Sequence, residues 1–98
     1  MASEAVTTKP FTGTGQTDSV IFEVGPFNLS LYATADPTAS ITGTSRLERS
    51  FNSGTTWLVV ETYTNAAAEK VIDNVEKSAL WRVKVTAHTT NITVRLGQ

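Results

Sequence analysis

Short runs in which apolar and polar residues alternate occupy most of the chain after residue 18, and turn residues separate them. In residues 28–35, Leu29, Leu31 and Ala33 fall on one face and more polar side chains fall on the other. A two-residue period of this kind is typical of a strand with one buried face. The same reading predicts strands over residues 19–24, 28–35, 39–50, 56–63, 79–87 and 91–96, and a shorter strand over 71–75.

Turn residues mark where these predicted strands end. Gly25-Pro26 and Asp36-Pro37 close two of them, and Asn52-Ser53-Gly54 reads as a hairpin turn in which Gly54 takes the positive φ. Gly43, inside a predicted strand, indicates a bulge or a close approach of two backbones.

Residues 64–77 have the least regular pattern in this part of the chain. The segment 65–70 reads NAAAEK, which contains helix formers but is too short to stand as a helix alone. We therefore expect a loop here, with at most one helical turn before the short strand at 71–75.

These elements predict an all-β fold, an antiparallel β-sandwich of about six to seven short strands that spans residues 18–98. The alternation of strands with helices of about 12 residues that signals a parallel sheet is missing from the pattern. Trp57 and Trp81 are the largest apolar side chains. We expect at least one of them at the centre of the core.

Residues 1–17 show no period and are rich in Thr and Gly. They are predicted to be an extended N-terminal arm that becomes ordered by packing on neighbouring subunits; the alternative is an arm that lies on its own domain. Lys9, Pro10 and Phe11 are the arm residues expected to bind a partner.

Composition narrows the class of partner. The chain has 98 residues, 17% of them charged, a net charge of -1 and no cysteine. A nearly neutral protein has no field to hold a polyanion, so we expect no nucleic-acid partner. No apolar run approaches the roughly 20 residues of a membrane-spanning helix, so we also expect no membrane partner. The lack of disulfides suits assembly in a reducing cytoplasm.

The residue types that support catalysis are sparse. The single histidine, His88, lies in a predicted turn, and the nine carboxylates are scattered. Glu69, Asp73 and Glu76 form the nearest approach to a cluster, and a solvated edge explains them better than a metal site. We therefore predict a protein that is not an enzyme, with no catalytic residues, cofactor, metal or small-molecule substrate.

Basic residues on predicted strands are the remaining polar feature. Arg46, Arg82 and Lys84 fall on outward faces, where their long side chains can reach a partner. We predict a subunit contact there. The alternative is that these charges discourage edge-to-edge aggregation.

Two segments carry a resemblance to a known family. Residues 47–60 read LERSFNSGTTWLVV and residues 80–96 read LWRVKVTAHTTNITVRL. Together they resemble small virion proteins of tailed bacteriophages, in which an LxRSFDGGxTW hairpin precedes a YRxxxTAxTSGTxxxRL hairpin. The resemblance covers roughly residues 28–98. It implies a β-sandwich component of the head or tail, such as a capsid decoration (cement) protein.

Residues 50–57 also resemble the Asp-box turn, S-x-D-x-G-x-T-W, of sialidase propellers and other β-proteins. Asn52 replaces the Asp and the motif occurs once, whereas propellers repeat it. The likeness therefore predicts a turn in which an Asx side chain caps the backbone and Trp57 packs beneath it, with no sialidase activity.

The leading expectation is a non-enzymatic phage structural protein on the capsid surface, assembled in the host cytoplasm. Its expected partners are the major capsid protein and copies of itself, with a trimer among the homo-oligomers considered. One alternative is a carbohydrate- or receptor-binding module of a tail fibre, with Tyr32, Tyr63 or Trp57 exposed as stacking platforms. Another is a tail or connector subunit with an extended loop at residues 64–77.

Overall fold

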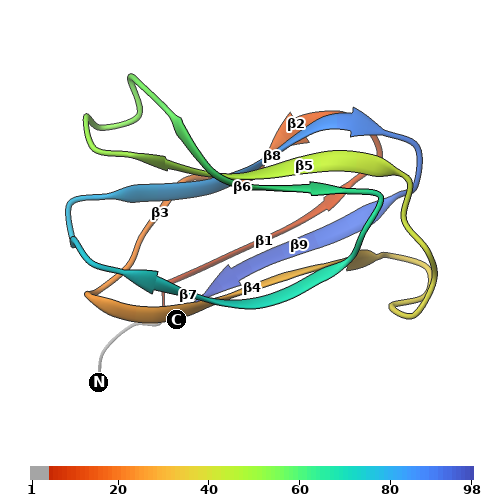
Figure 1. Cartoon of the computed structure of the whole chain (residues 1–98), viewed down its shortest axis with the longest axis horizontal. Coiled ribbons are helices and arrows are strands. Elements are labelled where there is room, and N and C mark those ends of the chain that lie inside the picture. Colours follow the sequence, from red (N-terminus) through yellow and green to blue (C-terminus); the bar gives the residue numbers. More distant parts are fainter. Residues whose placement is uncertain (1–4) are drawn as a thin grey trace.

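The computed structural model describes residues 5–98 and shows a sandwich of two antiparallel sheets, without a helix in that range (Figure 1). The strands are β1 (Val6–Phe11), β2 (Gly15–Gln16), β3 (Val20–Ile21), β4 (Gly25–Ala33), β5 (Gly43–Ser50), β6 (Leu58–Thr64), β7 (Ala68–Asn74), β8 (Leu80–His88) and β9 (Ile92–Gly97). The predicted all-β antiparallel sandwich is therefore confirmed.

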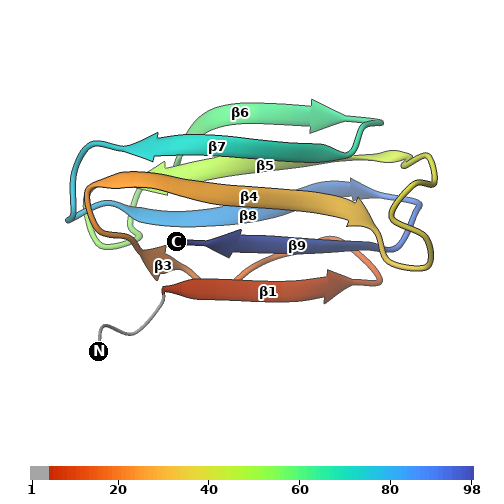
Figure 2. The ribbon, with the colours of Figure 1, turned by 90° about the horizontal axis from the view of Figure 1, so that it is seen from below.

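The strand order defines a jelly roll. Sheet A has the order β1-β9-β4-β7, and sheet B has the order β2-β8-β5-β6, with β3 also paired to β8. If β2 and β3 count as one interrupted strand along β8, the eight strands form two interleaved Greek keys, and every connection crosses between the sheets except the β5–β6 hairpin of sheet B. Strands β6 and β7 are then the free edges on one side of the sandwich (Figure 2).

The core lies between the sheets and is built by alternation along the strands. On β4, Phe27, Leu29, Leu31 and Ala33 are all buried, as the two-residue period predicts. Strands β8 and β9 contribute their inward residues in the same way, and the core residues of these strands are Trp81, Val83, Val85, Ile92, Val94 and Leu96.

An aromatic cluster fills one end of this core. The rings of Phe22 and Phe27 stack with centroids 4.3 Å apart, and Trp81 tilts against Phe27 at 4.8 Å. Trp81 is 1% exposed, which confirms that one tryptophan occupies the core. Trp57 is half-buried.

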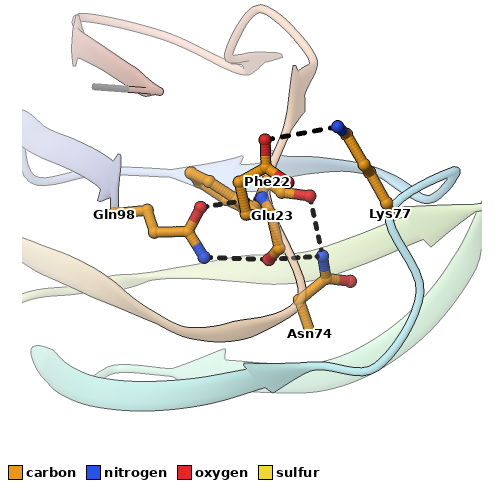
Figure 3. A network of polar contacts seen from close by, with 5 residues as sticks. All are labelled: Phe22, Glu23, Asn74, Lys77 and Gln98. Carbon is orange, nitrogen blue, oxygen red and sulfur yellow. Dashed lines mark hydrogen bonds and ion pairs between the residues drawn. The ribbon is translucent and has the colours of Figure 1, made fainter. Parts of the chain in front are cut away.

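Polar side chains form a network of hydrogen bonds and one ion pair beside the aromatic cluster (Figure 3). The Gln98 amide donates to the backbone oxygens of Glu23 and Pro26 and accepts from the Glu23 amide. Asn74 donates to the backbone oxygens of Phe22 and Glu23, and Lys77 pairs with the Glu23 carboxylate at 3.3 Å. Together these bonds tie the C-terminus and the end of β7 to the link between β3 and β4.

The N-terminal segment differs from the predicted arm. Strand β1 pairs with β9 from Val6↔Gly97 to Phe11↔Ile92, and β2 pairs with β8. Phe11 is 3% exposed and belongs to the core. The segment thus supplies an edge strand to sheet A and then crosses to sheet B, in keeping with the alternative that it lies on its own domain. It shows no period because β1 is a mostly exposed edge and β2 has two residues.

The segment 64–77 also differs from its prediction. Strand β7 spans Ala68–Asn74 and pairs with β4 at seven positions, from Gly25↔Asn74 to Leu31↔Ala68. Pairing with β4 outweighs the helix propensity of the alanines, because a segment this short does not form a stable helix alone and tertiary context decides its structure. Across residues 5–98 there is no helix that is long and apolar enough to cross a membrane.

Of the two alternatives predicted for Gly43, the close approach of two backbones is present at this residue, and a bulge lies nearby, with Thr86 of β8 as its extra residue. A Cβ placed on Gly43 would lie 2.6 Å from the carbonyl oxygen of Ala87, and the β5–β8 register shifts between Thr44 and Ser45. In the hairpin turn, Asn52 Oδ1 accepts from the Thr56 amide at 2.7 Å, and Gly54 has a φ of 87°. The Asp-box-like segment is therefore a capped turn.

Candidate functional site

The outer face of sheet B gathers three of the residues predicted to bind a partner. Arg46 on β5 lies directly opposite Lys84 on β8, and Glu48 lies opposite Arg82 two residues further along. The alternate residues Leu47 and Val83 point inward and are buried, so the charged row points away from the core. We call this row, with Trp57 and Val59, the basic face.

Arg82 is held rigidly in the middle of the basic face. Its Nε donates to Glu48 Oε1 over 2.8 Å, and its guanidinium carbon lies 4.0 Å from the centroid of the Trp57 ring. The Arg82 and Glu48 side chains are 14% and 5% exposed. Arg82 is thus neutralised by Glu48 and stacked on Trp57, which makes it a fixed part of the surface rather than a free cation.

Arg46 and Lys84 are different, because neither takes part in an ion pair within residues 5–98. Both are half-buried and sit opposite each other across β5 and β8. Like charges directly opposite in an antiparallel pair destabilise a sheet. Arg46 and Lys84 are thus two neighbouring cations without an ion-pair partner among residues 5–98, and they lie next to the Glu48–Arg82 pair. This arrangement favours the binding of an acidic partner surface.

Lys9, Pro10 and Phe11 lie apart from the basic face, on β1 at the free edge of sheet A. Lys9 and Pro10 are exposed, and the Lys9 Nζ lies 5.8 Å from the Phe11 ring centroid. Phe11 is a core residue, so its expected role as a partner contact is incompatible with this fold. The structure therefore places five of the six predicted residues on two separate surfaces and the sixth, Phe11, in the core.

The aromatic side chains proposed for sugar stacking do not form a platform. Tyr63 is 7% exposed, and burial, together with the negative charge of Glu61, raises the pKa of Tyr63 to about 12. One face of Trp57 is covered by Arg82, and Tyr32 lies half-buried on sheet A. In the described part of the chain the paired aromatic rings are those of Phe22, Phe27 and Trp81, all of them buried.

Surface depressions of the described residues include one beside Tyr32 and one beside His88. A depression of about 360 Å³ lies between β4 and β7 and is lined by Leu31, Tyr32, Pro37, Ala67, Ala68 and Glu69. His88 borders a much smaller cavity of about 10 Å³, and its Nε2 atom is buried without a hydrogen-bond partner among residues 5–98. Within the same residues no three His, Asp or Glu side chains come together as a metal site would require.

The fold and the basic face together define a jelly-roll β-sandwich with a rigid, charged outer sheet, an architecture used by viral capsid proteins and by lectins. Among solved structures, the chain is similar to the Yersinia pseudotuberculosis-derived mitogen (YPM), with a TM-score of 0.53 and 17% identity over 100% of this chain and 86% of that one. At this identity the likeness shows the fold alone. No known family and no curated protein sequence matches the chain.

Proposed function

We propose that the chain is a non-enzymatic structural protein of a phage virion, a decoration protein that binds the outside of the head shell through its basic face. Its partners are the major capsid protein and further copies of itself. It acts on the capsid surface after assembly in the host cytoplasm.

This proposal rests on two cations, Arg46 and Lys84, that lie opposite each other on adjacent strands. Next along the same strands is Arg82, which Glu48 and Trp57 hold in place. A rigid face loses little conformational entropy when it binds, so a modest area per copy suffices. If copies are linked to one another on a shell, their contacts reinforce each other through avidity.

Two further points support the proposal. Residues 47–60 and 80–96, which resemble phage virion proteins, form β5, the turn, β6, β8 and β9, and they include Glu48, Trp57, Arg82 and Lys84 of the basic face. The jelly-roll architecture is also common among capsid proteins, although the same fold serves unrelated functions.

The alternatives have less support. A carbohydrate-binding module of a tail fibre needs exposed aromatic rings, whereas Tyr63 is buried and Trp57 is stacked under Arg82. A tail or connector subunit needs residues 64–77 as an extended loop, and β7 occupies the middle half of that segment.

The proposal is tested by mixing the purified protein with phage heads prepared without it and measuring co-sedimentation and the heat resistance of the shells. We expect saturable binding at a fixed copy number and tougher shells. The variant with Arg46→Glu and Lys84→Glu should lose binding. A matched variant with Lys70→Glu and Lys77→Glu changes the net charge equally on exposed residues elsewhere and should bind. Absence of binding by the unmodified protein, or equal loss in both variants, would contradict the proposal.

A further inference from the structure

Strand β6 is a free edge whose first three residues carry no protecting side chain, because the inward-pointing Glu61 comes after them. It ends sheet B, and its first three residues, Leu58, Val59 and Val60, are 48%, 49% and 40% exposed. Proteins usually protect such edges with lysine, proline or a charged side chain that points inward, because free backbone groups pair with other strands. The stretch Leu58–Val60 has none of these, which marks it as a surface for strand addition.

A bulge determines where the side chains of β6 point. Leu47 on β5 pairs with Glu61 and the next residue, Glu48, pairs with Val59, so Val60 has no partner on β5. Leu58 lies opposite Arg49, in the same row as the buried Trp81, and therefore faces the inner side together with Glu61. Val59 and the inserted Val60 both face the outer side.

Arg49 provides a positive charge next to this edge. Its guanidinium carbon lies 4.8 Å from the Phe51 ring centroid and 5.4 Å from that of Trp81. Within residues 5–98 it forms no ion pair, and its Nε atom is buried without a hydrogen-bond partner. A partly buried guanidinium in this position favours a carboxylate supplied from outside the chain.

We propose that a second copy of the chain adds its β6 antiparallel to this edge about a two-fold axis. Val59 then lies opposite Val60 of the second copy, and Leu58 lies opposite Glu61 of the second copy. The four valines form an apolar cluster on the outer side. This self-association is separate from the proposed binding to a shell: it uses the edge of sheet B, where Val59 is the basic-face residue involved, and it does not use the cations Arg46 and Lys84.

The register follows from the bulge. Opposed residues in an antiparallel pair share a face, and a slip of one residue breaks this match. Pairing Leu58 with Glu61 and Val59 with Val60 keeps inner residues opposite inner residues and outer residues opposite outer ones. A register centred on Glu61 would instead place two carboxylates opposite each other, which is destabilising.

Charge complementarity supports a second copy as the occupant. In the proposed register, Glu61 of the second copy extends the row that contains Trp81, Arg49 and Leu58. Its backbone lies two strand spacings, roughly 10 Å, from that of Arg49, a gap that an Arg and a Glu side chain can bridge together. The present partner of Glu61 is Lys70 at 3.9 Å, with both side chains about half-exposed, so that pair is weak.

Cysteine cross-linking tests the register directly, since the chain has no cysteine of its own. Leu58→Cys mixed with Glu61→Cys should form a disulfide-linked dimer under mild oxidation, because opposed Cα atoms lie about 5.5 Å apart. Each variant alone should form little, because identical positions lie three residues apart along the strands, about 10 Å. Rapid cross-linking of Glu61→Cys alone, or none in the mixture, would overturn the proposal.

Sedimentation equilibrium of the whole protein tests the association itself. We expect a concentration-dependent dimer and, for Val60→Lys, a dissociation constant raised by roughly tenfold or more, because two lysines would enter the apolar cluster. Val71→Lys is the matched control: Val71 is 72% exposed on β7 of the other sheet, and this variant should dimerise normally. A monomer at every concentration up to about 1 mM, or an equal effect of both lysines, would refute the dimer.

Discussion

Trp81 donates its indole N–H to Oδ1 of Asn74 over 3.2 Å inside the core. The same Asn74 side chain donates to the backbone oxygens of Phe22 and Glu23 at 3.0 Å and 3.1 Å (Figure 3). Asn74 is 1% exposed, and both its amide hydrogens and its oxygen are in use. One buried amide therefore connects β8, the end of β7 and the link between β3 and β4.

Replacing Asn74 should destabilise the fold strongly. Asn74→Ala removes the partner of the Trp81 indole N–H and the donor to the Phe22 carbonyl oxygen, while the Glu23 oxygen keeps its bond from Gln98. We expect a loss of about 3 kcal/mol in the free energy of unfolding. Urea denaturation followed by tryptophan fluorescence measures it. Asn28→Ala, at an exposed position of β4, is the control and should change stability by no more than about 0.5 kcal/mol. Similar losses in both variants would show that the buried amide has no special role.

Deletion of the N-terminal segment should unfold the protein. Removing residues 1–17 takes away β1, β2 and the core ring of Phe11, and it exposes β9 and β8 as new edges. We expect loss of the cooperative thermal transition and of dispersed NMR signals. Removing residues 1–4 alone leaves the β1–β9 pairing from Val6 to Phe11 in place and should preserve both. A cooperative transition after removal of residues 1–17 would show that the rest of the sandwich folds without its first strands.

Much of the fold could be predicted from the sequence because β4 and β8 bury one face with a two-residue period, and the sequence of β9 alternates apolar and more polar residues in the same way although both its faces are largely buried. The period is lost where a strand lies at an edge or is interrupted. For this reason the local pattern predicts an arm where β1 lies, and a loop with only the short strand 71–75 where the mostly exposed β7 lies. In both segments the partner strand, which a local pattern does not reveal, decides the structure.

The candidate site was predicted in part for the same reason. Alternation was enough to place Arg46, Arg82 and Lys84 on an outward face. It did not reveal that Glu48 is 4% exposed and neutralises Arg82, because that pairing depends on the register between β5 and β8. The bulge at Val60 also interrupts the regular alternation expected over residues 56–63.

The Glu48–Arg82 pair should behave as a buried ion pair. Glu48→Ala leaves the guanidinium of Arg82 with little access to water and no carboxylate, so we expect a loss of about 3 kcal/mol in the free energy of unfolding. The double variant Glu48→Met with Arg82→Met should lose clearly less than the sum of the losses of Glu48→Met alone and Arg82→Met alone. A complete double-mutant cycle in urea measures this coupling. Strict additivity would mean that the 2.8 Å contact contributes nothing.

Tyr63 should make the protein sensitive to strongly alkaline pH. Its pKa is raised from 10.0 to about 12, first by burial and then by the charge of Glu61, so the fold favours the neutral phenol. This contribution to stability is fully present below about pH 10 and is lost as the pH rises through about 12. Tyr63→Phe cannot ionise and should lose less stability over that interval than the unmodified protein, as measured by urea denaturation at a series of pH values. At pH 7 it should be at least as stable, because the Tyr63 hydroxyl is buried without a hydrogen-bond partner in residues 5–98. Since all other titrating groups are shared, identical pH profiles would show that the phenol is as easily ionised in the fold as in water.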